Sequence, residues 1–132
     1  MKSVIILHPQ QPLGLLVNTA SILSVTLGSL IKDIRGADTI DKDEVKHLGV
    51  IKAPLPILQA DKEVLNNIYK KALEKDILVA DFTKVAQSCK SYDEYIALTR
   101  QYSTFDMGIL GLALYGRKKE INKLVGNLKV LK

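Results

Sequence analysis

ILGLALYGRKKEINKLVGNLKVL, residues 109–131, is the stretch that decides the fold of this chain. It begins with the apolar run Ile109–Tyr115, which is typical of a strand buried on both faces. A basic helix is predicted over Arg117–Val125, where Gly126 ends the helical pattern. Leu128–Leu131 is predicted to form a last, short strand. A strand, a helix and a strand in succession indicate a layered α/β domain.

The rest of the chain continues this alternation of strands and helices. Val4–Leu7 is a short apolar run rich in β-branched residues, which predicts a central strand. Ile77–Ala80 predicts a second buried strand that ends at Asp81. Three helices are predicted in this part of the chain. The first begins at about Leu13 and stops at Gly36, and the second follows an N-cap at Asp61. The third begins at a capping box formed by Ser91 and Glu94.

Two segments give weaker patterns. Leu55–Leu58 predicts a strand, but Pro54 and Pro56 lack N–H donors, so it should lie at a sheet edge or begin irregularly. Residues 37–53 are rich in turn formers and predict an excursion with a hairpin around Val45–Ile51. The whole pattern predicts a single domain over residues 1–132, with a mixed four- to five-stranded sheet flanked by helices.

Composition is that of an ordinary globular protein. The chain has 132 residues, of which 47% are hydrophobic and 25% charged, so disorder is not expected. Cys89 is the one cysteine and cannot form an intrachain disulfide, which indicates a reducing, cytoplasmic location. No cluster of His and Cys predicts a metal site, and no glycine-rich nucleotide motif predicts a cofactor.

Residues 3–31 contain no Asp, Glu, Lys or Arg. The stretch Leu13–Ile31 is about as long as a membrane span needs. It also carries six hydrogen-bonding side chains, namely Asn18, Thr19, Ser21, Ser24, Thr26 and Ser29. We therefore expect a central helix packed on both sides rather than a membrane partner.

The formal net charge is +5, and the excess of basic residues lies late in the chain. After residue 116 only Glu120 opposes six cations, namely Arg117, Lys118, Lys119, Lys123, Lys129 and Lys132. Such a patch can attract the phosphates of a tRNA-like ligand. A solvated helix face is the favoured interpretation, because no aromatic residues interleave with these lysines for base stacking.

Polar residues near strand ends are the candidates for chemistry, because open α/β sheets place their ligands there. The set consists of His8, Asn18, Thr19, Asp81, Thr83 and Lys84. An Asp that orients a water, close to a Lys and an amide, is adequate for a hydrolytic site. Each residue also has a structural alternative: Asp81 can cap the following turn, and Asn18 can satisfy a buried loop.

Four segments together resemble the uncharacterised DUF2000 family over nearly the whole chain. These are the run Leu112–Leu131, Gly14-x-x-x-Asn18, Leu78–Thr83 and Tyr92-x-x-Tyr95. The chain also resembles, more distantly, the type 2 peptidyl-tRNA hydrolases, which end in a helix and a Gly-Asn-Leu-Lys-x-Leu strand like Gly126–Leu131. That resemblance implies a mixed sheet between helices, and often a homodimer.

The resemblance to the hydrolases also implies site residues. Their catalytic Asp corresponds to Asp81, and Gly14 matches the glycine at the start of their first helix. They carry Lys-Gly-Lys at that point, the first lysine being catalytic, whereas this chain reads Leu13-Gly14-Leu15. Because leucine cannot donate a hydrogen bond to an ester carbonyl, turnover of peptidyl-tRNA is not expected unless Lys84 replaces the lysine.

Three functions remain open on the sequence. The favoured one is a hydrolase-like domain without hydrolase activity that binds a small or nucleotide-like ligand. Its contacts would come from Gly14, Asn18, Thr19, Asp81 and Thr83. The second is an active hydrolase of peptidyl-tRNA or another acyl ester, with Asp81 and Lys84 as catalytic residues. The third is a dimeric interaction module without a small-molecule site. A concave pocket that holds both Asn18 and Asp81 would favour the first two.

Overall fold

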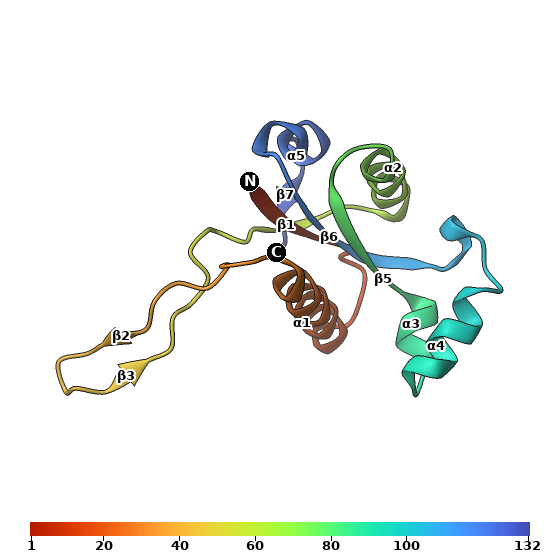
Figure 1. Cartoon of the computed structure of the whole chain (residues 1–132). Helices are drawn as coiled ribbons and strands as arrows, with labels where there is room; N and C mark the ends of the chain where they lie inside the picture. The colour runs from red at the N-terminus through yellow and green to blue at the C-terminus, as the bar shows by residue number, and fades with distance from the viewer.

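The computed structural model describes residues 1–132 as a five-stranded mixed sheet with helices on both faces (Figure 1). The strand order is β5-β6-β1-β4-β7, and only β1 and β4 pair in parallel. The strands are β1 (Lys2–Leu7), β4 (Ile57–Gln59), β5 (Leu78–Thr83), β6 (Ile109–Gly116) and β7 (Lys129–Val130). The predicted mixed α/β sheet is therefore confirmed, with β5 and β7 at its edges.

The core is built around β1 and β6, the two most apolar strands. The four apolar residues Val4–Leu7 are completely buried, and β6 pairs with them antiparallel. On one face lie α2 (Lys62–Leu73) and α5 (Lys118–Val125), which bury Leu65 and Ile121 against the sheet. The apolar run in β6 has no polar alternation because helices cover both of its faces.

Helix α1 (Leu13–Leu30) covers the other face of the sheet, and here two predictions were wrong. The helix ends at Leu30, not at Gly36, since Ile31 is extended and Asp33 adopts a positive φ of 57°. It is also not packed on both sides, because only Thr19, Leu23 and Leu27 are buried. By length and apolar composition alone, α1 could cross a membrane. Core helices of soluble proteins often meet the same two criteria.

Two strands differ from their predictions for local reasons. β4 is an inner strand between β1 and β7, so an edge position for Leu55–Leu58 is wrong. The other expectation, a disturbed start, agrees with the structure, because the strand begins only after Pro56 and neither proline interrupts its ladder. β5 is an exposed-edge strand that continues to Thr83, so Asp81 lies within the strand and not at its end. Asp81 therefore does not cap a turn.

Side-chain caps set the starts of three helices. Asp61 accepts from the Val64 N–H at 3.0 Å and begins α2, as predicted. Thr83 caps the short helix α3 (Lys84–Ser88), and Ser91 caps α4 (Tyr92–Thr99). Only half of the predicted capping box forms, because Glu94 accepts from the Lys90 N–H instead of from Ser91. A 3-10 turn (Thr104–Asp106) leads back into β6.

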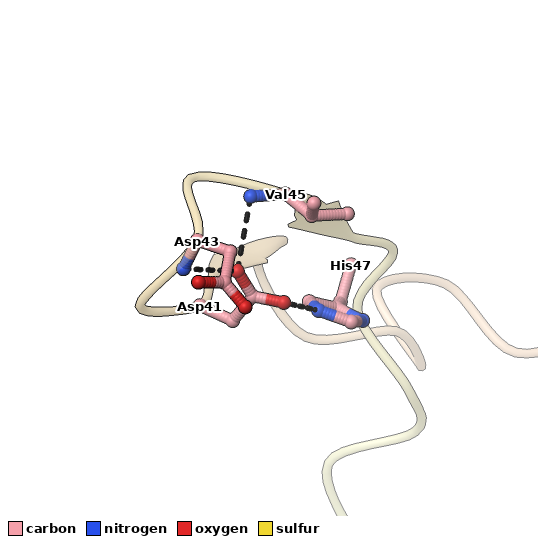
Figure 2. A network of polar contacts seen from close by, with 4 residues as sticks. All are labelled: Asp41, Asp43, Val45 and His47. Carbon is pink, nitrogen blue, oxygen red and sulfur yellow. Dashed lines mark hydrogen bonds and ion pairs between the residues drawn. The ribbon is translucent and has the colours of Figure 1, made fainter.

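Residues 34–52 form a hairpin that projects away from the rest of the molecule, and we call this segment the hairpin arm (Figure 1). Its strands β2 (Thr39–Ile40) and β3 (Lys46–His47) pair only with each other. The predicted hairpin is thus present, but Val45–Ile51 forms only its returning half, because the turn lies at residues 41–45. Asp41 holds this turn, accepting from two backbone N–H groups and contacting His47 at 2.7 Å (Figure 2).

Candidate ligand-binding cleft at the free edge of β5

Asp81 lies half-buried on β5, at the free edge of the sheet. Tyr69 of α2 donates a hydrogen bond from Oη to Asp81 Oδ1 at 3.3 Å. No lysine, arginine or histidine makes an ion pair with this carboxylate. Burial therefore raises the pKa of Asp81, and the hydrogen bond from Tyr69 opposes that rise only in part.

Two tyrosines share the environment of this carboxyl group. Burial, followed by the charge of Asp81, raises the pKa of Tyr69 to about 12. Burial and then the same charge also raise the pKa of Tyr95, on α4. Both phenols are consequently protonated at neutral pH, and Tyr69 donates its proton to Asp81.

A cavity of about 430 Å³ opens beside Asp81, between α1 and the α3–α4 segment. Ile22 and Thr26 of α1 form one wall, and Cys89, Tyr92 and Tyr95 form the other. The two tyrosine rings meet edge to face, with centroids 5.6 Å apart. Lys90 is the only cation in the lining. This volume is within the usual range of small-molecule pockets, and the lining combines apolar walls with a few polar groups.

The predicted site residues do not converge on this cleft. Asn18 is exposed on α1 and does not line the cavity, which is bordered on that helix by Ile22 and Thr26. Gly14 is exposed at the start of α1 with open space around it. The pocket expected to hold both Asn18 and Asp81 thus contains Asp81 alone.

Thr19 and Thr83 have structural partners. Thr19 is completely buried, and its Oγ1 donates to Gln11 Oε1 at 3.4 Å. Gln11 in turn donates to the carbonyls of His8 and Leu110, so that the pair fastens α1 to β1 and β6. Thr83 is buried and its Oγ1 accepts from the Ala86 N–H at 3.2 Å. Neither hydroxyl lines the Asp81 cleft.

Lys84 also lies apart from Asp81. It lines a separate cavity of about 220 Å³ together with His8, Gln10 and Lys62. Its aliphatic stem packs beside Gly108, where an added Cβ would come within 3.1 Å. The geometry therefore does not bring Asp81 and Lys84 together as a catalytic pair.

The residues that do surround Asp81 carry only weak sequence signals. Tyr92-x-x-Tyr95 stands out only as part of a family pattern, and Cys89 only as a lone thiol. Tyr69 gave no signal, because it lies on the apolar side of α2, where an aromatic residue is expected to be core. No group of three or more His, Cys, Asp or Glu is placed to hold a metal ion.

Comparison with known proteins assigns the family. The model of DUF2000, a protein family of unknown function, matches residues 1–132. The chain belongs to the DUF2000 family. A search of curated proteins found no significant match for this DUF2000 domain.

A solved structure shares the fold of this DUF2000 domain. It is that of a protein of unknown function from Agrobacterium tumefaciens, with a TM-score of 0.90 and 18% identity. The match covers 99% of this chain and 97% of the other. At that identity the likeness establishes the α/β fold alone.

Proposed function

We propose that this domain binds a small, planar ligand with N–H donors in the Asp81 cleft, and that it does not hydrolyse peptidyl-tRNA. The observation that carries the proposal is the half-buried Asp81 carboxylate without a cationic partner at the side of an aromatic-lined cavity. A carboxylate without a cationic partner at such a place accepts hydrogen bonds from a ligand more favourably than from bulk water.

The lining indicates the shape of the ligand. Tyr92 and Tyr95 offer aromatic surface for a flat ring, and Ile22 faces them from α1. Lys90 on the same cleft suits an anionic group. A nucleobase or a nucleotide combines these features, which agrees with the nucleotide-like ligand expected from the sequence.

We also propose that the domain has a hydrolase-like fold and that the protein is cytoplasmic. The resemblance to type 2 peptidyl-tRNA hydrolases supports descent of the fold, but a fold does not carry a reaction with it. Leu13, at the position of the hydrolases' catalytic lysine, is exposed and apolar. On that resemblance the cleft would keep an Asp at the place of the hydrolases' catalytic Asp and would lack their lysine.

The test is a titration of the intact protein with free nucleobases, nucleosides and nucleoside monophosphates, followed by amide NMR shifts. We expect shifts at residues 81–95 and affinity at least about 10-fold weaker in Asp81→Asn, since hydrogen bonds to charged groups are worth that much. Asp76→Asn, an exposed neighbour before β5, is the matched control and should bind as the wild type. Equal affinity in Asp81→Asn, or no binding by any member of the panel, would refute the proposal.

A further inference from the structure

The hairpin arm is a preformed structure that holds itself together. Gly36 N donates to Val50 O at 2.8 Å and Lys52 N to Ile34 O at 3.1 Å, so the two chains are bonded along the base of the arm. At Gly49 the chains approach so closely that an added Cβ would overlap the backbone of Gly36. The arm is therefore a defined shape, and binding would not have to order it.

Asp41 fixes the tip of the arm in the same way (Figure 2). Its Oδ1 accepts from the N–H groups of Asp43 and Val45 at 2.9 and 3.0 Å, and its Oδ2 contacts His47 Nε2. These bonds, that of His47 first, hold the pKa of Asp41 below its ordinary value.

This preformed arm exposes apolar side chains. Leu48 is 73% exposed and Val50 80% exposed, and Ile40, Val45 and Ile51 are exposed as well. A two-stranded hairpin is at best marginally stable in water, so these side chains would normally rest on another surface. The body of the same molecule does not supply that surface, because the arm points away from it (Figure 1).

The second unoccupied apolar surface is on α1. Leu13, Val17 and Val25 are all more than half exposed on a helix without a single charge. They line a groove of about 610 Å³ whose other wall includes Ile57 of β4 and Leu131. Apolar grooves of this kind receive an apolar partner in other proteins.

The two surfaces complement each other in apolar area. The tip of the arm carries charges of both signs, with Lys42 and Lys46 beside Asp41, Asp43 and Glu44, so its apolar side chains are what match the groove. The exposed large apolar side chains that would meet are Ile40, Val45, Leu48, Val50 and Ile51 of the arm and Leu13, Val17 and Val25 of the groove. A large apolar side chain removes roughly 60–120 Å² of apolar surface from water when it is fully buried, so these partly exposed side chains supply about the apolar half of a standard interface of ~800 Å² per partner.

We propose that the hairpin arm of one copy packs into the apolar α1 groove of a second copy, and that the second copy returns its own arm. A two-fold axis makes this exchange reciprocal, so that both arms and both grooves are occupied without an open-ended chain of molecules. The occupant is thus a second copy of this chain, because the chain itself carries both halves of the contact.

The test begins with the mass of the protein in solution, measured by light scattering over a range of concentrations. The wild type should be a dimer. Val50→Glu on the arm and Val25→Lys on α1 should each weaken the dimer by roughly 30-fold or more, as charges do at the centre of an interface. Leu73→Glu changes another exposed apolar residue, on α2 and away from both surfaces, and this control should remain a dimer.

Mixing the two charged variants makes the test specific. A pair of Val50→Glu and Val25→Lys chains has one intact arm–groove contact, and in its other contact a Glu meets a Lys. The mixture should therefore form a heterodimer where neither variant dimerises alone.

Gly49→Val deforms the arm without removing an apolar contact. This variant should also be a monomer, and its circular dichroism spectrum should be unchanged.

Three outcomes would overturn the proposal. These are a monomeric wild type, a dimer that survives both charged variants, and a mixture that stays monomeric. If the monomeric wild type instead floats with neutral phosphatidylcholine vesicles, the occupant of the α1 surface is a membrane and not a second copy. Circular dichroism and thermal unfolding of each variant identify any that fails to fold, and Val17→Lys then replaces Val25→Lys.

Discussion

Tyr69 reaches from α2 to the edge strand β5 and donates its phenolic hydrogen to Asp81, with Oη and Oδ1 3.3 Å apart. The same ring meets Phe105 edge to face at 6.0 Å, so packing fixes its direction. Tyr69 thus orients the carboxyl group of Asp81, a residue that borders the cleft. We expect Tyr69→Phe to lower the free energy of unfolding by about 1 kcal/mol, measured in urea, because a half-buried acceptor loses its donor.

The raised pKa of Asp81 predicts a pH dependence. Between the unfolded-state pKa, about 3.9, and the higher folded-state pKa, the folded protein binds more protons than the unfolded chain. The contribution of this carboxyl to stability is therefore most favourable below the unfolded-state pKa, and it falls as pH rises through the folded-state pKa. The asparagine of Asp81→Asn does not titrate. As pH rises from about 3 to about 7, the wild type should therefore lose stability relative to Asp81→Asn.

The measurement is the difference in unfolding free energy between Asp81→Asn and the wild type at each pH, so that the titration of other groups cancels. Asp76→Asn, on an exposed turn, serves as the comparison. If the unfolding free energy of Asp81→Asn fell relative to that of the wild type as pH rises, the pKa of Asp81 would be lowered by folding and not raised.

Thr83 is predicted to act in folding and not in ligand contact. Thr83→Ala removes the acceptor for the Ala86 N–H and should cost about 1 kcal/mol of stability. Thr83→Ser keeps the oxygen and should retain most of the stability. Affinity for the ligand of the Asp81 cleft, measured with both variants at a temperature where they are folded, should not change. A large loss of affinity in Thr83→Ala would place the hydroxyl in the site after all.

Gly111 allows α1 to approach β6 closely. A Cβ there would lie 2.8 Å from Leu7 Cδ2 and 3.0 Å from Leu23 Cδ1, in the packed core. We expect Gly111→Ala to destabilise the protein by about 1–3 kcal/mol in urea unfolding. Gly28→Ala is the control inside α1, where nothing lies within 4 Å, and it should stabilise by roughly 1 kcal/mol. If Gly111→Ala changed the free energy of unfolding no more unfavourably than Gly28→Ala does, α1 would be free to shift on the sheet, and the close approach at Gly111 would not matter.

Peptidyl-tRNA turnover is predicted to be absent or slow. Losing one preorganised donor lowers a rate by about 100- to 1000-fold, and Lys84 lines a different cavity from Asp81. Release of labelled peptide from peptidyl-tRNA by the wild type should therefore stay near the uncatalysed level. Ordinary turnover that disappears in Lys84→Ala would restore the hydrolase interpretation with a relocated lysine.

The sequence alone determined the central strands, the helices between them and the α/β class. Val4–Leu7 and Ile109–Tyr115 are too apolar to lie anywhere but between two covered faces, so their burial follows from composition. Asp61 was recognisable as a cap because its hydrogen bond is local, with donor and acceptor three residues apart. Such short-range features need no knowledge of the rest of the fold.

Only the tertiary structure decided which polar residues share a space. Asp81 and Tyr69 are twelve residues apart on different elements, and the pairing of β5 with β6 at the sheet edge brings them together. The same holds for α1, whose charge-free sequence suits burial on both sides although the fold covers only one. Apolar patterning states that a face must be buried, but the arrangement of elements decides what buries it, within one chain or between two.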